Sequence, residues 1–239
     1  MSNRQNLEQL LQNNSYPGRG IVIGKHADGQ HAVIAYFIMG RSENSRNRVF
    51  EETEDGIRTK ALDESKMTDP SLIIYHPVRR LENGITLVSN GDQTDTMRDG
   101  ILQGHCYRHG LHRRTFEPDG PNWTPRISGV MKPDGSYNLS ILKSLDGDPD
   151  CCCRYFFEYE SPKAGTGHFI STYQGDGAPL PSFTGEPVFA DLTAPDAPAL
   201  ARELWESLDA DNKVSLYVDY IDLESGEHHT VIRNKHEEA

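Results

Sequence analysis

The sequence IVIGKHADGQHAVIAYFI, residues 21–38, decides the fold class of this chain. Two apolar runs, Ile21–Gly24 and His31–Ile38, flank the dipeptide Asp28-Gly29. Such a dipeptide readily adopts the positive φ of a tight turn, and between apolar runs it is a strong hairpin signal. We therefore predict two antiparallel strands joined by a short loop.

Further strands follow along the chain, most of them in pairs around a turn that contains glycine. The predicted pairs, with their turns, are Arg48–Thr53 and Ile57–Ala61 (Asp55-Gly56), Ser71–Tyr75 and Ile85–Ser89 (Asn83-Gly84), Arg126–Met131 and Tyr137–Leu142 (Pro133-Asp134-Gly135), and Val214–Leu223 and His229–Arg233 (Ser225-Gly226). Two single strands are predicted at Cys151–Tyr159 and His168–Tyr173. Hairpins at this density indicate antiparallel sheets and argue against parallel βαβ units.

Three segments carry the apolar spacing of helices, and they are residues 4–13, residues 95–114 and Ala197–Leu208. Glycines inside the second segment weaken that prediction or mark close packing. Residues 175–198 are rich in Pro and Gly and are predicted to form a long loop. Because sheet and helix segments alternate along the chain, we expect an α+β layered sandwich.

The bulk composition fits a single soluble domain. The chain has 239 residues, of which 36% are hydrophobic and 25% charged. We expect a helical extension at residues 1–15 and one domain over residues 16–239. The polar N-terminal sequence has no apolar signal core, and no run of about eighteen apolar residues is present. With four cysteines compatible with a reducing compartment, these features predict a cytoplasmic protein without a membrane segment.

The charge of the chain is strongly acidic and unevenly distributed. The formal net charge of −12 argues against binding to nucleic acid. Residues 1–132 hold 17 Lys and Arg against 16 Asp and Glu, whereas residues 133–239 hold 7 against 20. An acidic protein that handles an anionic ligand needs a local basic patch. We expect that patch in the first half of the chain.

Six stretches, taken in order, carry a resemblance to a known family. They are Gly18–Gly24; Ala35-Tyr36 with Gly40-Arg41-Ser42 and Asn47-Arg48; Ile74-Tyr75; Val88–Gly91 with Thr94-Asp95-Thr96; Phe116-Glu117 with Thr124–Ile127; and Ile170–Tyr173. Each stretch alone is weak, but their order and spacing are specific. By these stretches the chain resembles the archaeal-type IMP cyclohydrolase family. It departs from the family in its N-terminal helix, its acidic C-terminal third and a one-residue-longer loop after Glu117.

The resemblance implies a four-layer αββα sandwich with antiparallel sheets, similar to N-terminal-nucleophile hydrolases but without their self-processing chemistry. It also implies an activity, the closure of FAICAR (5-formamidoimidazole-4-carboxamide ribonucleotide) to inosine monophosphate (IMP) and water. That reaction is the last step of de novo purine biosynthesis. It requires no metal and no other cofactor.

The resemblance assigns catalysis to Arg48, Tyr75 and Glu117. An amide nitrogen is a poor nucleophile, so its proton must leave during attack, and the carboxylate of Glu117 suits either removal of that proton or orientation of the amide. The formyl oxygen gathers negative charge, which the Tyr75 hydroxyl would stabilise. The Arg48 guanidinium suits either this developing oxyanion or the substrate phosphate. On residue type alone, the alternatives are a solvated loop acid, a basic surface loop and a core tyrosine.

Substrate binding is expected from ten further residues, namely Arg19, Arg41, Ser42, Asn47, Asn90, Gly91, Thr94, Asp95, Thr96 and Arg126. Residues 89–96 form a strand-to-helix turn whose N–H groups suit an anion. Asp92 and Asp95 would oppose a phosphate there, so contact with ribose hydroxyls or the base is an equal alternative. Simple capping of the helix by Thr94 or Asp95 needs no ligand.

The histidines and cysteines show no strong metal motif. His105 and His109 have i, i+4 spacing, but no matching acid follows them. The consecutive residues Cys151–Cys153 would point to alternate faces of a strand, which does not favour a metal cage. We therefore expect no metal.

Two other functions stay open. One is an amidohydrolase on the same fold, which would need a nucleophile at a new N-terminus. The other is a purine-nucleotide-binding protein without catalysis, against which the joint presence of Arg48, Tyr75 and Glu117 argues. The expected partner is a purine nucleotide, and assembly into a homo-oligomer is left open.

Overall fold

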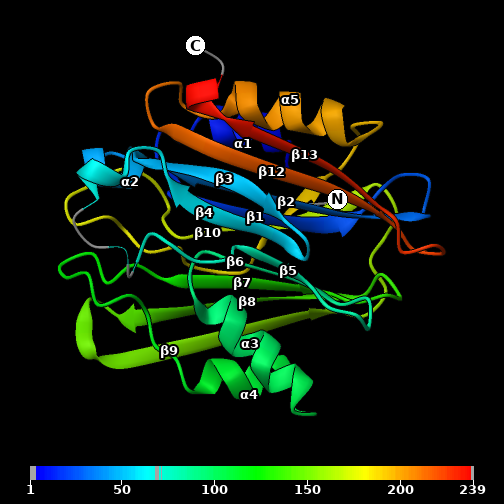
Figure 1. Cartoon of the computed structure of the whole chain (residues 1–239), viewed down its shortest axis with the longest axis horizontal. Coiled ribbons are helices and arrows are strands. Elements are labelled where there is room, and N and C mark those ends of the chain that lie inside the picture. Colours follow the sequence, from blue (N-terminus) through cyan, green and yellow to red (C-terminus); the bar gives the residue numbers. More distant parts are fainter. Residues whose placement is uncertain (1–3, 68–69, 71, 238–239) are drawn as a thin grey trace.

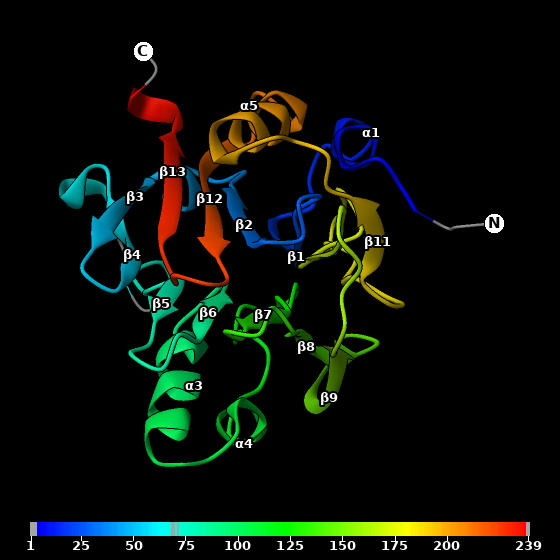
Figure 2. The same cartoon turned by 90° about the vertical axis from the view of Figure 1, so that its right-hand side faces the viewer.

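The structure, a computed structural model, describes residues 4–67, 70 and 72–237. Two antiparallel β-sheets lie face to face, and helices cover the outer face of each sheet (Figure 1). The same four layers follow one another in the view at a right angle (Figure 2). The predicted α+β layered sandwich with antiparallel sheets is confirmed. The closer likeness to N-terminal-nucleophile hydrolases stays a prediction.

The first sheet has six strands in the order β11–β10–β1–β2–β12–β13. Their bounds are β1 Arg19–Lys25, β2 His31–Met39, β10 Thr166–Ser171, β11 Val188–Asp191, β12 Lys213–Asp222 and β13 His228–Asn234. The β1–β2 and β12–β13 hairpins confirm the predictions. The predicted loop over residues 175–198 is wrong for β11, a short edge strand whose pairing with β10 is not visible in local composition.

The second sheet has seven strands in sequence order, β3–β4–β5–β6–β7–β8–β9. Their bounds are β3 Arg48–Thr53, β4 Gly56–Ala61, β5 Val78–Arg80, β6 Thr86–Ser89, β7 Arg126–Met131, β8 Tyr137–Leu145 and β9 Asp148–Tyr159. The predicted β3–β4 and β7–β8 hairpins are confirmed. The chain then crosses from β9 to β10 in the first sheet, so those two strands do not pair.

Five α-helices and two short 3₁₀ helices lie in the described residues. Their bounds are α1 Leu7–Gln12, α2 Glu43–Arg46, α3 Gln93–Leu102, α4 Tyr107–His112, α5 Ala197–Ser207, η1 Glu64–Lys66 and η2 Lys235–Glu237. Within residues 4–67, 70 and 72–237, no helix combines the length and the apolar character that crossing a membrane requires.

Alternation along β1 shows how the layers form. Ile21 and Ile23 lie in the hydrophobic cluster between the two sheets, whereas Val22 belongs to the cluster under the helices. Successive strand side chains point to opposite faces, so an apolar run of this kind suits a strand that is buried on both sides. The β1–β2 hairpin therefore lies at the centre of the first sheet, with apolar side chains on both of its faces.

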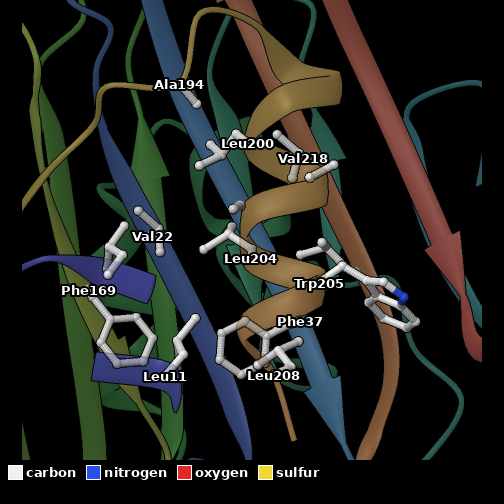
Figure 3. Close-up of a cluster of buried hydrophobic side chains, with 14 of the residues drawn as sticks. Leu11, Val22, Phe37, Phe169, Ala194, Leu200, Leu204, Trp205, Leu208 and Val218 are labelled. Atoms are coloured by element: carbon white, nitrogen blue, oxygen red, sulfur yellow. The ribbon is translucent and has the colours of Figure 1, made fainter. Parts of the chain in front are cut away.

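Helices α5 and α1 cover the outer face of the first sheet. Leu200 and Leu204 of α5 and Leu11 of α1 pack with Val22 and Phe37 (Figure 3). The leucines of α1 are thus part of the core, although the boundary between a 1–15 extension and a 16–239 domain stays a prediction. On the opposite face of the molecule, α3 and α4 cover the second sheet.

The predicted single helix over residues 95–114 is wrong. It is two helices, α3 and α4, separated at Gly104, whose φ of 81° lies in the left-handed region that ends a helix. Gly110 of α4 lies so close to α3 that a Cβ there would meet the Thr96 carbonyl oxygen at 2.7 Å. The glycines therefore mark a break and a close helix contact.

The predicted strand Ser71–Tyr75 is also wrong where the structure describes it. Ser71 lies outside the described residues, and residues 72–75 form turns and bends. The turn at residues 83–84 is tight, because the Leu81 N–H donates a hydrogen bond to the Ile85 carbonyl at 2.8 Å. The partner of β6 must therefore lie directly before the turn, and that partner is β5.

Candidate active site

A cavity of about 370 Å³ opens at the end of the β1–β2 hairpin where Arg19 begins β1 and Met39 ends β2. Its walls come from these strand ends, α2, the loop after Glu117 and the segment that follows β10. The lining residues are Tyr16, Arg19, Met39, Arg41, Ser42, Asn44, Ser45, Arg48, Leu72, Ile73, Glu117, Asp119, Asn122, Thr124, Tyr173 and Leu180.

Glu117 is a buried acid in the wall of this cavity, with 2% of its surface exposed. Its Oε2 accepts a hydrogen bond from Arg19 Nη2 at 3.3 Å, and its Oε1 accepts one from Asn90 Nδ2 at 3.4 Å. Its backbone N–H donates to the Thr124 carbonyl at 2.9 Å, which closes the intervening loop. The alternative of a solvated loop acid does not fit this position.

Burial and the neighbouring positive charges shift the pKa of Glu117 in opposite directions. Removal from water raises the pKa of this carboxyl above its ordinary value, while the positive charges of Arg19, Arg126 and Arg48 counteract part of the rise. A carboxylate in this balance is a stronger base than an exposed one and is still held by cations. That is the environment in which enzymes place a general base.

Arg48 is the second buried charge of the cavity, with 2% of its surface exposed. It follows α2, whose start is fixed by reciprocal hydrogen bonds between Ser42 and Ser45. Among the described residues, its guanidinium donates to protein only from Nε, to the Ser45 carbonyl at 3.0 Å. Burial lowers the pKa of Arg48 from its ordinary value. Its terminal nitrogens are therefore available to a ligand.

Tyr75 lies behind the cavity wall, and its hydroxyl is 2.9 Å from the hydroxyl of Tyr36. The Tyr75 backbone is held beside β4 by hydrogen bonds with Thr59. Burial raises the pKa of Tyr36 well above its ordinary value, so this hydroxyl stays protonated. When one hydroxyl donates to the other, the second retains a proton that it can donate elsewhere.

Three of the ten predicted substrate contacts line the cavity: Arg19, Arg41 and Ser42. Arg41 lies over the ring of Tyr16, with its guanidinium carbon 4.9 Å from the ring centroid, and it pairs with Asp176. Its side chain keeps 38% of its surface exposed. The predicted basic patch of the first half of the chain thus lies at the cavity mouth and floor.

Four other predicted contacts form a layer behind Glu117. Asn90 donates to the Pro125 carbonyl at 2.9 Å and accepts from the Ile127 N–H at 2.8 Å. Arg126 donates to Asp92 at 2.9 Å and to Gln93 at 2.7 Å. Gly91 leaves room for that arginine, because a Cβ at Gly91 would lie 2.4 Å from its Nη1. Thr94 donates to the Gly91 carbonyl at 3.0 Å.

The remaining three predicted contacts, Asn47, Asp95 and Thr96, are not among the described residues that line the cavity. The Asn47 side chain is tied to the Asp63 backbone by two hydrogen bonds of 2.8 Å. Asp95 pairs with Arg79 and Arg98, each at 2.9 Å. Thr96 lies in α3 beside α4. The roles given to all ten residues stay predictions.

Several cavity residues were not singled out by the sequence. Thr124 Oγ1 contacts both the Tyr173 hydroxyl and the carboxylate of Asp119. Burial raises the pKa of Tyr173 to about 12. Thr124 and Tyr173 both fall in stretches that carry the family resemblance, which was the available signal. The aromatic wall at Tyr16 had no comparable signal beyond its place before Pro17-Gly18.

Fold and site together define an α+β layered protein with a buried carboxylate and guanidinium groups around a cavity suited to an anionic ligand. A family model described as IMP cyclohydrolase-like protein matches residues 16–226. The chain belongs to the IMP cyclohydrolase-like family.

Two curated relatives, from two strains of Halobacterium salinarum, are both called IMP cyclohydrolase. Each is 28% identical to this chain over 133 residues. The match covers 54% of this chain and 63% of the relative, which is less than two thirds of the relative's own length.

Proposed function

We propose that this chain is an IMP cyclohydrolase that converts FAICAR to IMP and water. The observation that carries the proposal is the buried Glu117 carboxylate, held at 3.3 Å by Arg19 in a cavity that also contains the guanidinium of Arg48. Membership of the family and the names of the curated relatives support the same activity.

The phosphate of the substrate binds at the exposed side of the cavity. Arg41 and Ser42 lie there, and the start of α2 follows them directly. A guanidinium offers a planar pair of donors to phosphate oxygens. The stacked ring of Tyr16 holds the Arg41 side chain in place. The reacting groups then extend inward toward Glu117 and Arg48.

Ring closure begins with attack of the carboxamide nitrogen on the formyl carbon. Glu117 accepts a proton from that nitrogen as the N–C bond forms, and the formyl oxygen becomes an oxyanion. Return of this proton from Glu117 to the oxygen gives a hydroxyl group. The hydroxyl leaves as water after it takes up a second proton, which the formamido N–H releases as this nitrogen and the former formyl carbon form their double bond. One carboxamide hydrogen, one formamido hydrogen and the formyl oxygen are thus lost as water.

Arg48 stabilises the developing oxyanion, and the Tyr36–Tyr75 hydroxyl pair supplies a further proton donor. Fixed donors of this kind act strongly in a cavity from which water is largely excluded. Both reacting groups belong to one substrate, so holding it in the folded conformation supplies another large share of the acceleration. With this function we also expect a cytoplasmic location and leave assembly into a homo-oligomer open.

The test is a conversion assay with the purified, chelator-treated chain. We expect FAICAR to be consumed and IMP to appear in equal amounts, and IMP to raise the thermal unfolding temperature. Stabilisation by IMP without turnover would support the nucleotide-binding alternative instead. Release of ammonia without ring closure would support the amidohydrolase alternative.

A further inference from the structure

The far end of the β1–β2 hairpin carries a second cluster of chemically active side chains, His26, Asp28 and His31. Asp28 Oδ2 lies 2.9 Å from His26 Nδ1 and 2.7 Å from His31 Nδ1. One nitrogen or oxygen from each residue lies within 4.8 Å of those of the other two. Two imidazole nitrogens and one carboxylate oxygen are a donor set typical of first-row transition-metal sites.

The hairpin turn positions the Asp28 carboxylate for this role. Its Oδ1 accepts hydrogen bonds from the backbone N–H of Gln30 at 2.7 Å and of His31 at 3.2 Å. Gly29, with a φ of 73°, allows the tight turn, and its N–H donates to the His26 carbonyl at 3.0 Å. One carboxylate oxygen is therefore used by the backbone, which leaves Oδ2 directed at the two imidazoles.

The three side chains are fixed and still accessible to an ion. The exposed fractions are 13% for His26, 24% for His31 and 34% for Asp28. The His26 ring also packs on the Tyr220 ring, with centroids 5.4 Å apart. They border a cavity of about 490 Å³, and His229 of β13 lies on the same wall. A metal held by three protein ligands would keep an open position toward this cavity.

We propose that His26, Asp28 and His31 bind a divalent first-row transition-metal ion, with zinc as the probe of choice. Each imidazole presents the lone pair of Nδ1 to the ion and carries any remaining proton on Nε2. This inference revises the expectation from sequence that the chain holds no metal. It does not depend on the proposed function.

The site is separate from the candidate active site. The two cavities share no lining residue, and they lie at opposite ends of β1. From Arg19 to Lys25 the strand rises about 20 Å, at about 3.4 Å per residue. A metal bound here is structural or serves a second ligand, and it does not touch the groups around Glu117.

The test is calorimetric titration of the full, chelator-treated chain with zinc chloride. We expect one zinc per chain, and at least about ten-fold weaker binding in Asp28→Asn and in the double variant His26→Asn/His31→Asn, since even indirect partners of metal ligands change affinity by this much. The matched control is His105→Asn/His109→Asn, which removes a stacked histidine pair with centroids 4.2 Å apart. It should retain wild-type affinity.

The wild-type chain also gives a direct readout that needs no variant. In nuclear magnetic resonance spectra, zinc should shift the Nδ1 resonances of two histidine rings and leave their Nε2 protonated. The proposal is overturned by absence of zinc binding to the wild-type chain, by binding that is unchanged in the Asp28 and double variants, or by binding that is lost in the His105/His109 control.

Discussion

The two ends of the β1–β2 hairpin carry different chemistry on one pair of strands. At the Arg19 end, the side chain of Glu117 is 3% exposed, and its carboxylate faces guanidinium groups. At the Asp28 end, the side chain of Asp28 is 34% exposed, and its carboxylate faces two imidazoles. Burial beside guanidinium groups raises the basicity of the Glu117 carboxylate, whereas the accessible Asp28 carboxylate between two imidazoles provides a place for an added cation. The different chemistry of the Glu117 and Asp28 carboxylates therefore depends more on their surroundings than on the residue type.

The largest expected effect comes from Glu117→Gln. Glutamine keeps the size of the side chain but cannot accept the amide proton, so kcat should fall by roughly a hundred-fold or more. Binding of IMP should change little. Glu51→Gln is the matched control, because Glu51 is a surface carboxylate paired with Arg58 and Lys60. A folded Glu117→Gln protein with wild-type kcat would remove Glu117 from the chemistry.

Arg48→Lys should also lose activity, although lysine retains the positive charge in solution. The planar fork is lost, and the burial that lowers the pKa of Arg48 would lower that of a lysine further. We expect a roughly ten- to thousand-fold loss of kcat, comparable with removing an oxyanion donor. The exposed Arg58→Lys serves as the control. Near-normal turnover would assign Arg48 to general electrostatics.

Tyr75→Phe should have a smaller effect on turnover. We expect a roughly ten-fold loss, below that of a complete oxyanion donor, because the Tyr36 hydroxyl 2.9 Å away remains. The free energy of unfolding should fall by about 1–3 kcal/mol, since the Tyr36 hydroxyl loses a buried partner. Tyr217→Phe, which removes another buried hydroxyl bond, should lose stability without loss of kcat. Equal kcat losses in both variants would indicate a structural role only.

Asp28→Asn should have the smallest effect on cyclisation. A substitution far from the reacting groups changes free energies by about 0.5 kcal/mol, so kcat and KM should stay within about two-fold of wild type. Chelator should likewise leave the rate unchanged. The same variant is expected to lose zinc affinity, so a single substitution would show that zinc binding and cyclisation are independent functions of the two ends of the hairpin. A rate that falls on chelation and returns with zinc would contradict this separation.

The sequence predicted most of the sheet architecture because its signals are local. Asp28-Gly29 and Asp55-Gly56 each mark a turn between neighbouring strands, and both hairpins are present. Edge strand β11 and the break between α3 and α4 were missed, because a pairing partner and a left-handed glycine depend on the rest of the fold.

The candidate site was predictable only through resemblance. Arg19 and Glu117 are 98 residues apart, and no local pattern states that their side chains meet. The His26, Asp28 and His31 cluster is close in sequence, but its spacing belongs to no helical metal motif. Only the hairpin turn brings its ligand atoms together. Long-range packing and turn geometry are the parts that sequence reasoning could not supply.

The pH dependence of kcat tests the central claim, that the buried Glu117 carboxylate takes the proton. Below its raised pKa this carboxyl is neutral and accepts no proton, so kcat should fall as pH falls, with an apparent pKa above the ordinary glutamate value. The substrate phosphate also titrates near pH 6, but that limb would persist in Glu117→Gln. We predict that the fall of kcat caused by protonation of Glu117 is present in the wild-type pH profile and absent from the residual rate of the Glu117→Gln variant. The same limb in both proteins, or a flat wild-type profile, would contradict the account.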